Sequence, residues 1–366
     1  MIQVVRHKLE EEIVFIIATV IAIVTSFIVR PDYSAIDLRV LCALLNLMLI
    51  SLAFETYHLL DGIAIYILNK AHTMRAIGWV MILLSAAMGM LMTNDVALLT
   101  VVPITLAIGR KGNFDPLKII VLETAAANIG SSLTPFGNPQ NLYLYHHFQI
   151  DTLHFLTVTA PFTLVGLFAL MLLNSRTQRT PLSATLHPVI FKHPRKLLLY
   201  GILFLLVIAS VLRLLDYRLM TPLVLFTVFV LDRKLYKKVD YYLLLTFVSF
   251  FIAIDNITRL PWIHTFISGL LDNPLHTYLT ASLLSQGISN VPAAILLSGF
   301  TQHVDALLLG VSIGGLGTLV ASLANLISYK LYCRSHSGKH YRAYFYPVNF
   351  ALLVILGMAV ALRWVI

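Results

Sequence analysis

The sequence predicts an all-α polytopic membrane protein made of two inverted five-helix repeats, each with a re-entrant hairpin and a broken transmembrane helix. Three observations predict this fold. Apolar segments recur along the whole chain, basic residues gather in the connections between them, and polar motifs return about half a chain later.

The apolar segments are long enough to cross a bilayer. Of the 366 residues, 58% are hydrophobic and 12% are charged, and the mean hydropathy is +0.85. Soluble domains carry roughly 25% charged residues, so the composition excludes an ordinary soluble enzyme. Most segments approach the ~20 residues that a membrane-spanning helix needs. They cover 13–29, 41–53, 78–92, 153–173, 197–212, 219–231, 243–254 and 347–362.

The positions of the basic residues predict the topology. The net charge of +9 does not indicate nucleic acid, because the basic residues form no single patch interleaved with aromatic side chains. Segment 174–196 contains five basic residues and no acid, which places it in the cytoplasm. The arrangement that puts 20 of the 26 Lys and Arg residues inside has ten crossings and both termini outside, and we expect a bacterial cytoplasmic (inner) membrane.

The second half of the chain repeats the first. An offset of 183 or 184 relates spans near 13, 36 and 56 to spans near 197, 219 and 240, and it pairs Gly130 with Gly314 and Asn141 with Asn325. Repeat one is therefore predicted over 1–173, with scaffold helices at about 13–69, a hairpin at 78–109 and a broken helix at 117–150. After a linker at 174–196, repeat two covers 197–366, with the same elements at about 197–258, 275–300 and 306–328. Such inverted repeats are typical of secondary transporters.

Each hairpin is predicted to turn at a polar tip. The tips are Thr93-Asn94-Asp95 and Ser289-Asn290, which combine helix-capping residues with the start of a new helix. Pro292 in the first turn suits such a start, because its missing N–H costs nothing there. The flanking charges predict that the first hairpin opens to the cytoplasm and the second to the outside.

The following spans are predicted to be interrupted. Segment 125–141 contains Thr134-Pro135 and Asn138-Pro139, and proline removes a backbone donor and clashes with the preceding turn. Segment 310–325 has four glycines instead, so its break is inferred from the repeat. The glycines by themselves favour close helix packing. Because caps and breaks coincide in both halves, we expect a functional centre near the midplane, where carbonyls can bind cations and helix N-termini can bind anions.

At these segments the sequence resembles the ion transporter superfamily, which includes arsenite permeases, citrate transporters and divalent anion/sodium symporters. Thr93-Asn94-Asp95 resembles the hairpin tip of arsenite permeases, and residues 134–141 resemble the superfamily's Thr-Pro-x-Gly-Thr-Pro-Pro-Asn motif. The resemblance implies a homodimer and an elevator-like mechanism. It also implies cation or coupling positions at Thr93, Asn94, Asp95, Gly137, Ser289, Asn290 and Ala321, with sodium as the only cofactor, and substrate positions at Asn94, Asn138, Asn141, Asn290, Ser322 and Asn325.

The leading hypothesis is a secondary transporter of a small anion coupled to sodium or protons. The alternative within transport is a sodium/proton antiporter or a metalloid exporter, for which Asp95 and Asp255-Asn256 would suit proton exchange. An intramembrane enzyme and a passive channel are remote alternatives. The first would need a nucleophile with its base, and paired inverted breaks suit alternating access better than a continuous pore.

Overall fold

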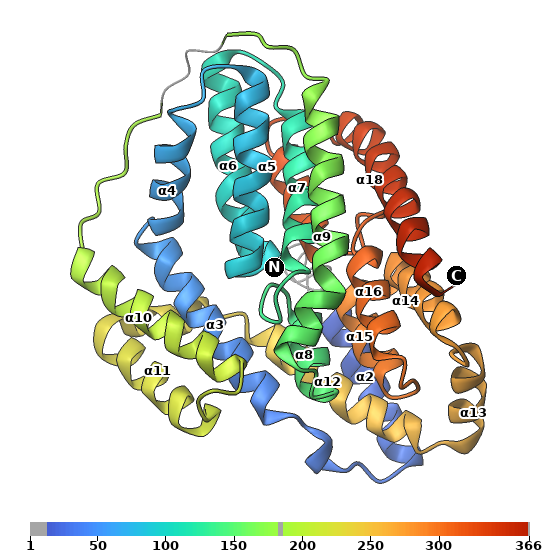
Figure 1. The fold of residues 1–366 in the computed structure, drawn as a ribbon. Coiled ribbons are helices and arrows are strands. Elements are labelled where there is room, and N and C mark those ends of the chain that lie inside the picture. Colours follow the sequence, from blue (N-terminus) through green and yellow to red (C-terminus); the bar gives the residue numbers. More distant parts are fainter. Residues whose placement is uncertain (1–12, 182–185, 365–366) are drawn as a thin grey trace, which may run out of the picture.

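The computed structural model describes residues 13–181 and 186–364, and these residues form an all-α protein (Figure 1). The described part has no strand, only one isolated bridge between Thr73 and Pro181. The helices of the first half are α2 (Ile13–Ile28), α3 (Leu38–Thr56), α4 (Leu59–Leu68), α5 (Met74–Leu91), α6 (Asn94–Gly112), α7 (Leu117–Ser131), α8 (Pro139–His147) and α9 (Thr152–Ser175). Those of the second half are α10 (Pro194–Val211), α11 (Tyr217–Asp232), α12 (Tyr241–Thr258), α13 (Pro261–Leu270), α14 (Pro274–Ile288), α15 (Asn290–Ser298), α16 (Val304–Gly314), α17 (Leu323–Cys333) and α18 (Gly338–Ala361).

The helices have the length and surface of membrane spans. Six of them are long and apolar enough to cross a bilayer: α3, α5, α9, α10, α12 and α18, the last extended to Trp364. Large apolar side chains such as Leu205, Leu219 and Phe226 are exposed on α10 and α11. In water these exposed apolar side chains would promote aggregation, whereas lipid tails cover them without cost. The protein is therefore an integral membrane protein.

Side-chain caps determine where several helices begin. Asp37 accepts hydrogen bonds from two backbone N–H groups at the start of α3, and Asp151 does the same for α9. Thr73 caps α5, and Asn273 caps α14. Such caps satisfy N–H groups that have no partner within the helix, and each contributes about 1 kcal/mol.

Contacts between distant segments define two ends of the molecule. At the linker end, Asn69 bonds to the backbone of Leu186, and Tyr332 bonds to Asp115. At the far end, Asp305 at the start of α16 contacts His154 and Arg363. Helices α5, α6, α7 and α9 run between these ends side by side (Figure 1).

Helices α3 and α4 follow one another and together cross the molecule once (Figure 1). Arg39 at the start of α3 lies beside His146 at the far end, whereas Asn69, just after α4, lies at the linker end. The bend between them is at His58, whose φ of 54° is left-handed. The sequence analysis counted these helices as two separate crossings, whereas here they follow one course from the far end to the linker end.

Helix α2 runs parallel to α12. The Phe15 and Tyr242 rings make an edge-on contact, Thr19 bonds to Ser249, and Thr25 bonds to Asn256. Arg259, which follows α12, donates to the carbonyl of Arg30, so both helices end together. Since α12 ends beside Gly299 at the mouth of the second hairpin, α2 also ends at the far end.

Two groups of helices surround the polar segments. Helices α6 to α9 pack against α16, α17 and α18, and α5 packs on α6, α7 and α9. We call these helices, with α14 and α15, the core group. Helices α2, α3, α4, α10, α11 and α12 form the flanking group, in which α3 packs on α10 and α11. The core group contains both hairpins and both interrupted spans. Helix α13 lies between the end of α12 and the start of the second hairpin.

Candidate functional site: two hairpin tips and two helix breaks

The hairpin tips are short gaps between helices. Helix α5 ends at Leu91 and α6 begins at Asn94, where the Thr93 hydroxyl accepts from the N–H of Val96. Helix α14 ends at Ile288 and α15 begins at Asn290, with Ser289 between them at a φ of 76°. A left-handed serine is rare, because its side chain crowds the backbone in that conformation. It lets the chain reverse with a single residue.

Each tip contacts the break in its own half. The N–H of Asn94 donates to the carbonyl of Gly137 at 3.2 Å, and the N–H of Asn290 donates to the carbonyl of Ala321 at 3.0 Å. The Ser289 hydroxyl also donates to Ala321, at 3.4 Å. The structure thus brings together the tip and break residues that the resemblance associated with two cation positions.

Asn141 and Asn325 bind the freed carbonyls of the two breaks in the same way. The Asn141 amide donates to the carbonyls of Ser131, Ser132 and Thr134, and the Asn325 amide donates to those of Gly315 and Thr318. Gly315, Thr318 and Asn325 each lie 184 positions after Ser131, Thr134 and Asn141. These two side chains therefore hold the breaks open, and their amide nitrogens are occupied.

The second break forms without proline. Helix α16 ends at Gly314 and α17 begins at Leu323, and Gly317 has a φ of 101°, which favours glycine. Gln286 of the adjacent hairpin donates to the carbonyls of Gly314 and Leu316 and accepts from the N–H of Thr318. Its side chain replaces helical hydrogen bonds that the break removes. The sequence analysis did not single out Gln286.

The paired glycines allow close helix contact. A Cβ at Gly130 would lie 2.5 Å from the backbone oxygen of Ala86, and one at Gly314 would lie 2.7 Å from the Ser285 side chain. These contacts agree with the packing interpretation of both glycines. Gly315 differs, because its Cβ would meet the Asn290 amide at 2.9 Å.

The centre of the site is a cluster of buried amides and one hydroxyl from both halves. Asn128 accepts from the Asn94 amide at 3.0 Å and from the Ser322 hydroxyl at 3.1 Å, and it donates to Asn325 at 2.7 Å. Asn94 also approaches Ser322 at 3.4 Å. All four residues are at most 4% exposed. The site therefore joins the first tip to the second break through Asn128, which the sequence analysis missed.

Asn128 left only a weak signal in the sequence. It stands two residues before Gly130, in an alanine-rich stretch of the segment quoted for the first break. The residue 184 positions later is Ser312, whose buried hydroxyl has no partner among the described residues. Because the repeat does not preserve the amide, the symmetry argument passed over it.

Other predicted residues occupy less central places. Asn138 caps α8 by accepting from the N–H of Asn141 at 2.9 Å, and its amide donates to Ser131. Asp95 lies in the first turn of α6, and one of its carboxylate oxygens is buried without a partner among the described residues. Asp255 forms an ion pair with Arg259 near the far end, while Asn256 bonds to Thr25 and Ser26.

A second buried carboxylate lies nearby on α7. Glu123 is fully buried and accepts from Thr105 of α6 at 2.9 Å, while its other oxygen has no partner in the described part of the chain. The next residue, Thr124, donates to Ser328, which also receives a bond from Tyr341. Polar contacts therefore continue from the centre toward the linker end.

Membrane helices that break in pairs around buried polar groups define a class of membrane transporter. The chain belongs to the citrate transporter family, whose model matches residues 1–306. It is 37% identical to an uncharacterized transporter of Methanocaldococcus jannaschii, over 82% of each chain. It is 31% identical to the inner membrane protein YbiR of Escherichia coli, over 88% of this chain and 89% of that protein.

A solved structure supports the fold. The YdaH transporter of Alcanivorax borkumensis, described as having an unusual topology, matches with a TM-score of 0.57 over 90% of this chain and 85% of that one. The identity is 14%, so this likeness concerns the fold alone. The family and the fold agree with the resemblance that the tips and breaks indicated.

Proposed function

We propose that this protein is a secondary transporter of a small anion, coupled to sodium or protons, in which the core group moves against the flanking group in an elevator-like manner. One observation carries the proposal: Asn94, Asn128, Ser322 and Asn325 meet where a hairpin tip and two helix breaks converge. Uncharged donors and acceptors at this depth are costly unless they serve a ligand or one another. Here they are paired with one another, so an anion would bind by replacing these mutual bonds.

The oxygen atoms beside the hairpin tips suit sodium as the coupling ion. The carbonyls of Gly137 and Ala321 lie beside the tips, and the Ser289 hydroxyl lies 3.4 Å from the carbonyl oxygen of Ala321. Oxygen ligands without charge match a monovalent hard cation, and a cation held there would attract an anion at the neighbouring centre. This arrangement supports symport of the two ions.

One observation favours the sodium/proton alternative. The unpartnered oxygen of Asp95 lies in the first turn after the tip, where no equivalent acid exists in the second half, because the residue 196 positions later is Val291. A carboxylate that gains and loses a proton at that place would couple proton movement to the site.

We also propose a revised topology with nine crossings, which the charge rule and the helix directions support. The inner membrane and the homodimer stay part of the proposal, on the resemblance that the tips and breaks indicated. We place the linker end in the cytoplasm, so that α18 ends outside and α2 starts from the cytoplasmic side. The first residues of the chain lie outside the described part. This proposal starts α2 on the cytoplasmic side, whereas the sequence analysis expected both termini outside. Compared with the ten-crossing topology, this topology assigns Arg30 and Arg39 to the outside and Arg6 and Lys8 to the inside. The numbers of Lys and Arg residues therefore stay at 20 inside and 6 outside.

Transport by purified protein in liposomes tests the proposal. Citrate, phosphate and succinate are offered with an imposed sodium gradient, an imposed pH gradient, or neither. We expect uptake of at least one anion that a gradient accelerates, and loss of that uptake in Asn94→Ala and Asn290→Ala while both variants remain folded. Uptake that ignores both gradients, or variants that transport normally, would remove the proposal.

A further inference from the structure

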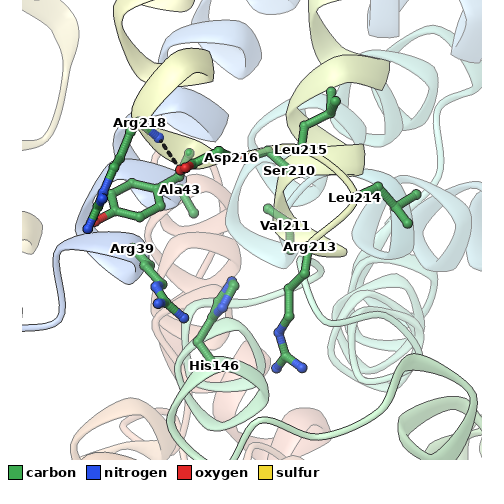
Figure 2. A pocket seen from close by; sticks show the side chains of 11 residues that line it. Arg39, Ala43, His146, Ser210, Val211, Arg213, Leu214, Leu215, Asp216 and Arg218 are labelled. Atoms are coloured by element: carbon green, nitrogen blue, oxygen red, sulfur yellow. Dashed lines mark hydrogen bonds between the residues drawn. The ribbon is translucent and has the colours of Figure 1, made fainter.

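A cavity of about 390 Å³ lies at the far end, away from the central cluster (Figure 2). Its walls come from the start of α3, the end of α8 and the turn at 212–216 between α10 and α11. Helix α8 belongs to the core group, and the other elements belong to the flanking group. The cavity therefore lies between the two groups.

The lining of this cavity is strongly basic. Arg39, Arg213, Arg218 and His146 face it, together with a single acid, Asp216 (Figure 2). The Asp216 carboxylate caps α11 by accepting from the N–H of Arg218 at 2.9 Å. Asp37, which lies nearby, caps α3 in the same way. In the described part of the chain, the Arg39 guanidinium has no ion pair, so the cavity keeps an excess of positive charge.

Arg213 is held in place by the end of α8. Its guanidinium donates to the carbonyl of Tyr145 and lies over the Tyr145 ring, 4.3 Å from the ring centre. Its backbone has a φ of 63°, a left-handed conformation that costs free energy in a non-glycine residue. The turn is therefore built to present this side chain beside α8.

His146 provides an unsatisfied donor or acceptor at the cavity wall. The residue is 9% exposed, and its Nε2 has no hydrogen-bond partner among the described residues. Leaving a buried polar atom unpaired costs about 1–3 kcal/mol. A ligand oxygen in the cavity would pair with it.

We propose that this cavity is a second anion-binding site that takes one oxyanion, supplied either as a free ion or as the phosphate of a lipid headgroup. Guanidinium groups bind carboxylate and phosphate through parallel, charge-assisted hydrogen bonds, and His146 supplies a further donor in the tautomer that has its proton on Nε2. The site is distinct from the central cluster, whose partners are uncharged. An anion here ties α8 of the core group to α3 and α11 of the flanking group.

The test uses inorganic phosphate as the probe. The melting temperature of the full-length protein in a neutral detergent is measured in sodium phosphate and in sodium chloride at equal sodium concentration and ionic strength. A ligand that binds only the folded state raises this temperature by mass action. We expect phosphate to raise it above chloride, and Arg39→Gln and Arg213→Gln each to lose at least half of that difference.

Three variants keep the result interpretable. Arg233→Gln removes an exposed arginine from the turn after α11, at a distance from the cavity, and should keep the full shift. Arg39→Lys keeps the charge and should keep more of the shift than Arg39→Gln, which separates anion binding from a folding defect. Asn128→Ala should lose transport yet keep the full shift, so failure of the transport proposal leaves this test intact.

Nanodiscs separate the two sources of the anion. If phosphate raises the melting temperature in phosphatidylcholine nanodiscs but not in phosphatidylglycerol nanodiscs, the site is assigned to a lipid headgroup. If phosphate raises it in both, the site is assigned to a free ion. The absence of any shift over chloride in detergent and in phosphatidylcholine overturns the proposal. A full shift in both Arg39→Gln and Arg213→Gln also overturns it.

Discussion

Asn128 of α7 donates a hydrogen bond of 2.7 Å to the side-chain oxygen of Asn325 on α17, and this contact connects the two halves of the chain. Asn325 in turn donates to the carbonyls of Gly315 and Thr318 in the second break. On its other side, Asn128 accepts from Asn94 at the first hairpin tip. One amide therefore links a tip in the first half to a break in the second.

Replacing Asn128 should abolish transport with a moderate loss of stability. Asn128→Ala removes three buried hydrogen bonds, and each bond left unmade costs about 1–3 kcal/mol before the neighbours adjust. Uptake in liposomes and the melting temperature are measured together. Asn46→Ala is the matched control, because Asn46 is also buried but bonds to Thr221 within the flanking group. It should lose stability and keep its uptake per folded molecule; equal loss of uptake in both variants would contradict a central role for Asn128.

The second break should depend on Gln286. Gln286→Met introduces the residue type found 196 positions earlier, at Met90, and removes the bonds to Gly314, Leu316 and Thr318. Since these bonds replace helical ones, we expect a lower melting temperature and faster hydrogen exchange over 315–322. The same substitution at an exposed position, Gln302→Met, serves as control. Unchanged exchange over the break would mean that Asn325 and Gly317 suffice to hold it.

The glycine of the first half should tolerate no side chain. In Gly130→Ala the new methyl group would lie 2.5 Å from the backbone oxygen of Ala86, and such overpacking costs about 1–3 kcal/mol. Gly201→Ala on α10 meets nothing within 4 Å, and it should be neutral or stabilising by ~0.5–1 kcal/mol. The melting temperature should therefore fall in Gly130→Ala and stay the same or rise in Gly201→Ala. A stable Gly130→Ala would show that α5 and α7 can separate without cost.

Cysteine labelling should distinguish nine crossings from ten. In a background without Cys42 and Cys333, Gly112→Cys should react only with reagent that reaches the cytoplasm, and His303→Cys only from outside. Arg30→Cys decides between the counts, because the structure groups Arg30 with the far end through Arg259. We expect it to react from outside together with position 303. Labelling from the cytoplasm would restore the ten-crossing arrangement.

Asp95 should influence how transport depends on the driving ion. Asp95→Asn preserves the size of the side chain at the first turn of α6 but removes the charge that a proton or a bound cation neutralises. Uptake is measured against pH and sodium concentration for both proteins. We expect the variant to lose activity or to show a flatter dependence. If both profiles match the wild type, Asp95 acts only as a favourable residue at a helix start, worth typically ~0.3–1 kcal/mol.

The sequence by itself determined the features that depend on neighbouring residues. Apolar segments predicted an all-α membrane protein, because a helix in lipid must satisfy its own backbone. Local chemistry also marked the places where helices stop: Thr93 caps α6, and Asn138-Pro139 starts α8. The family match agrees with the resemblance drawn from these motifs. The functional roles of the tip and break residues stay predictions.

Only the tertiary structure decided which polar groups meet and in which direction each helix runs. Asn128 and Gln286 acquire their importance from partners far along the chain, so no local pattern distinguishes them from ordinary buried amides. The number of crossings could not be predicted for a different reason. Exchanging Arg6 and Lys8 for Arg30 and Arg39 leaves the charge balance the same, so the charge rule accepts either topology. The parallel packing of α2 on α12 and the end-to-end course of α3 and α4 support the proposed nine crossings, because those directions are set by contacts between helices and not by composition.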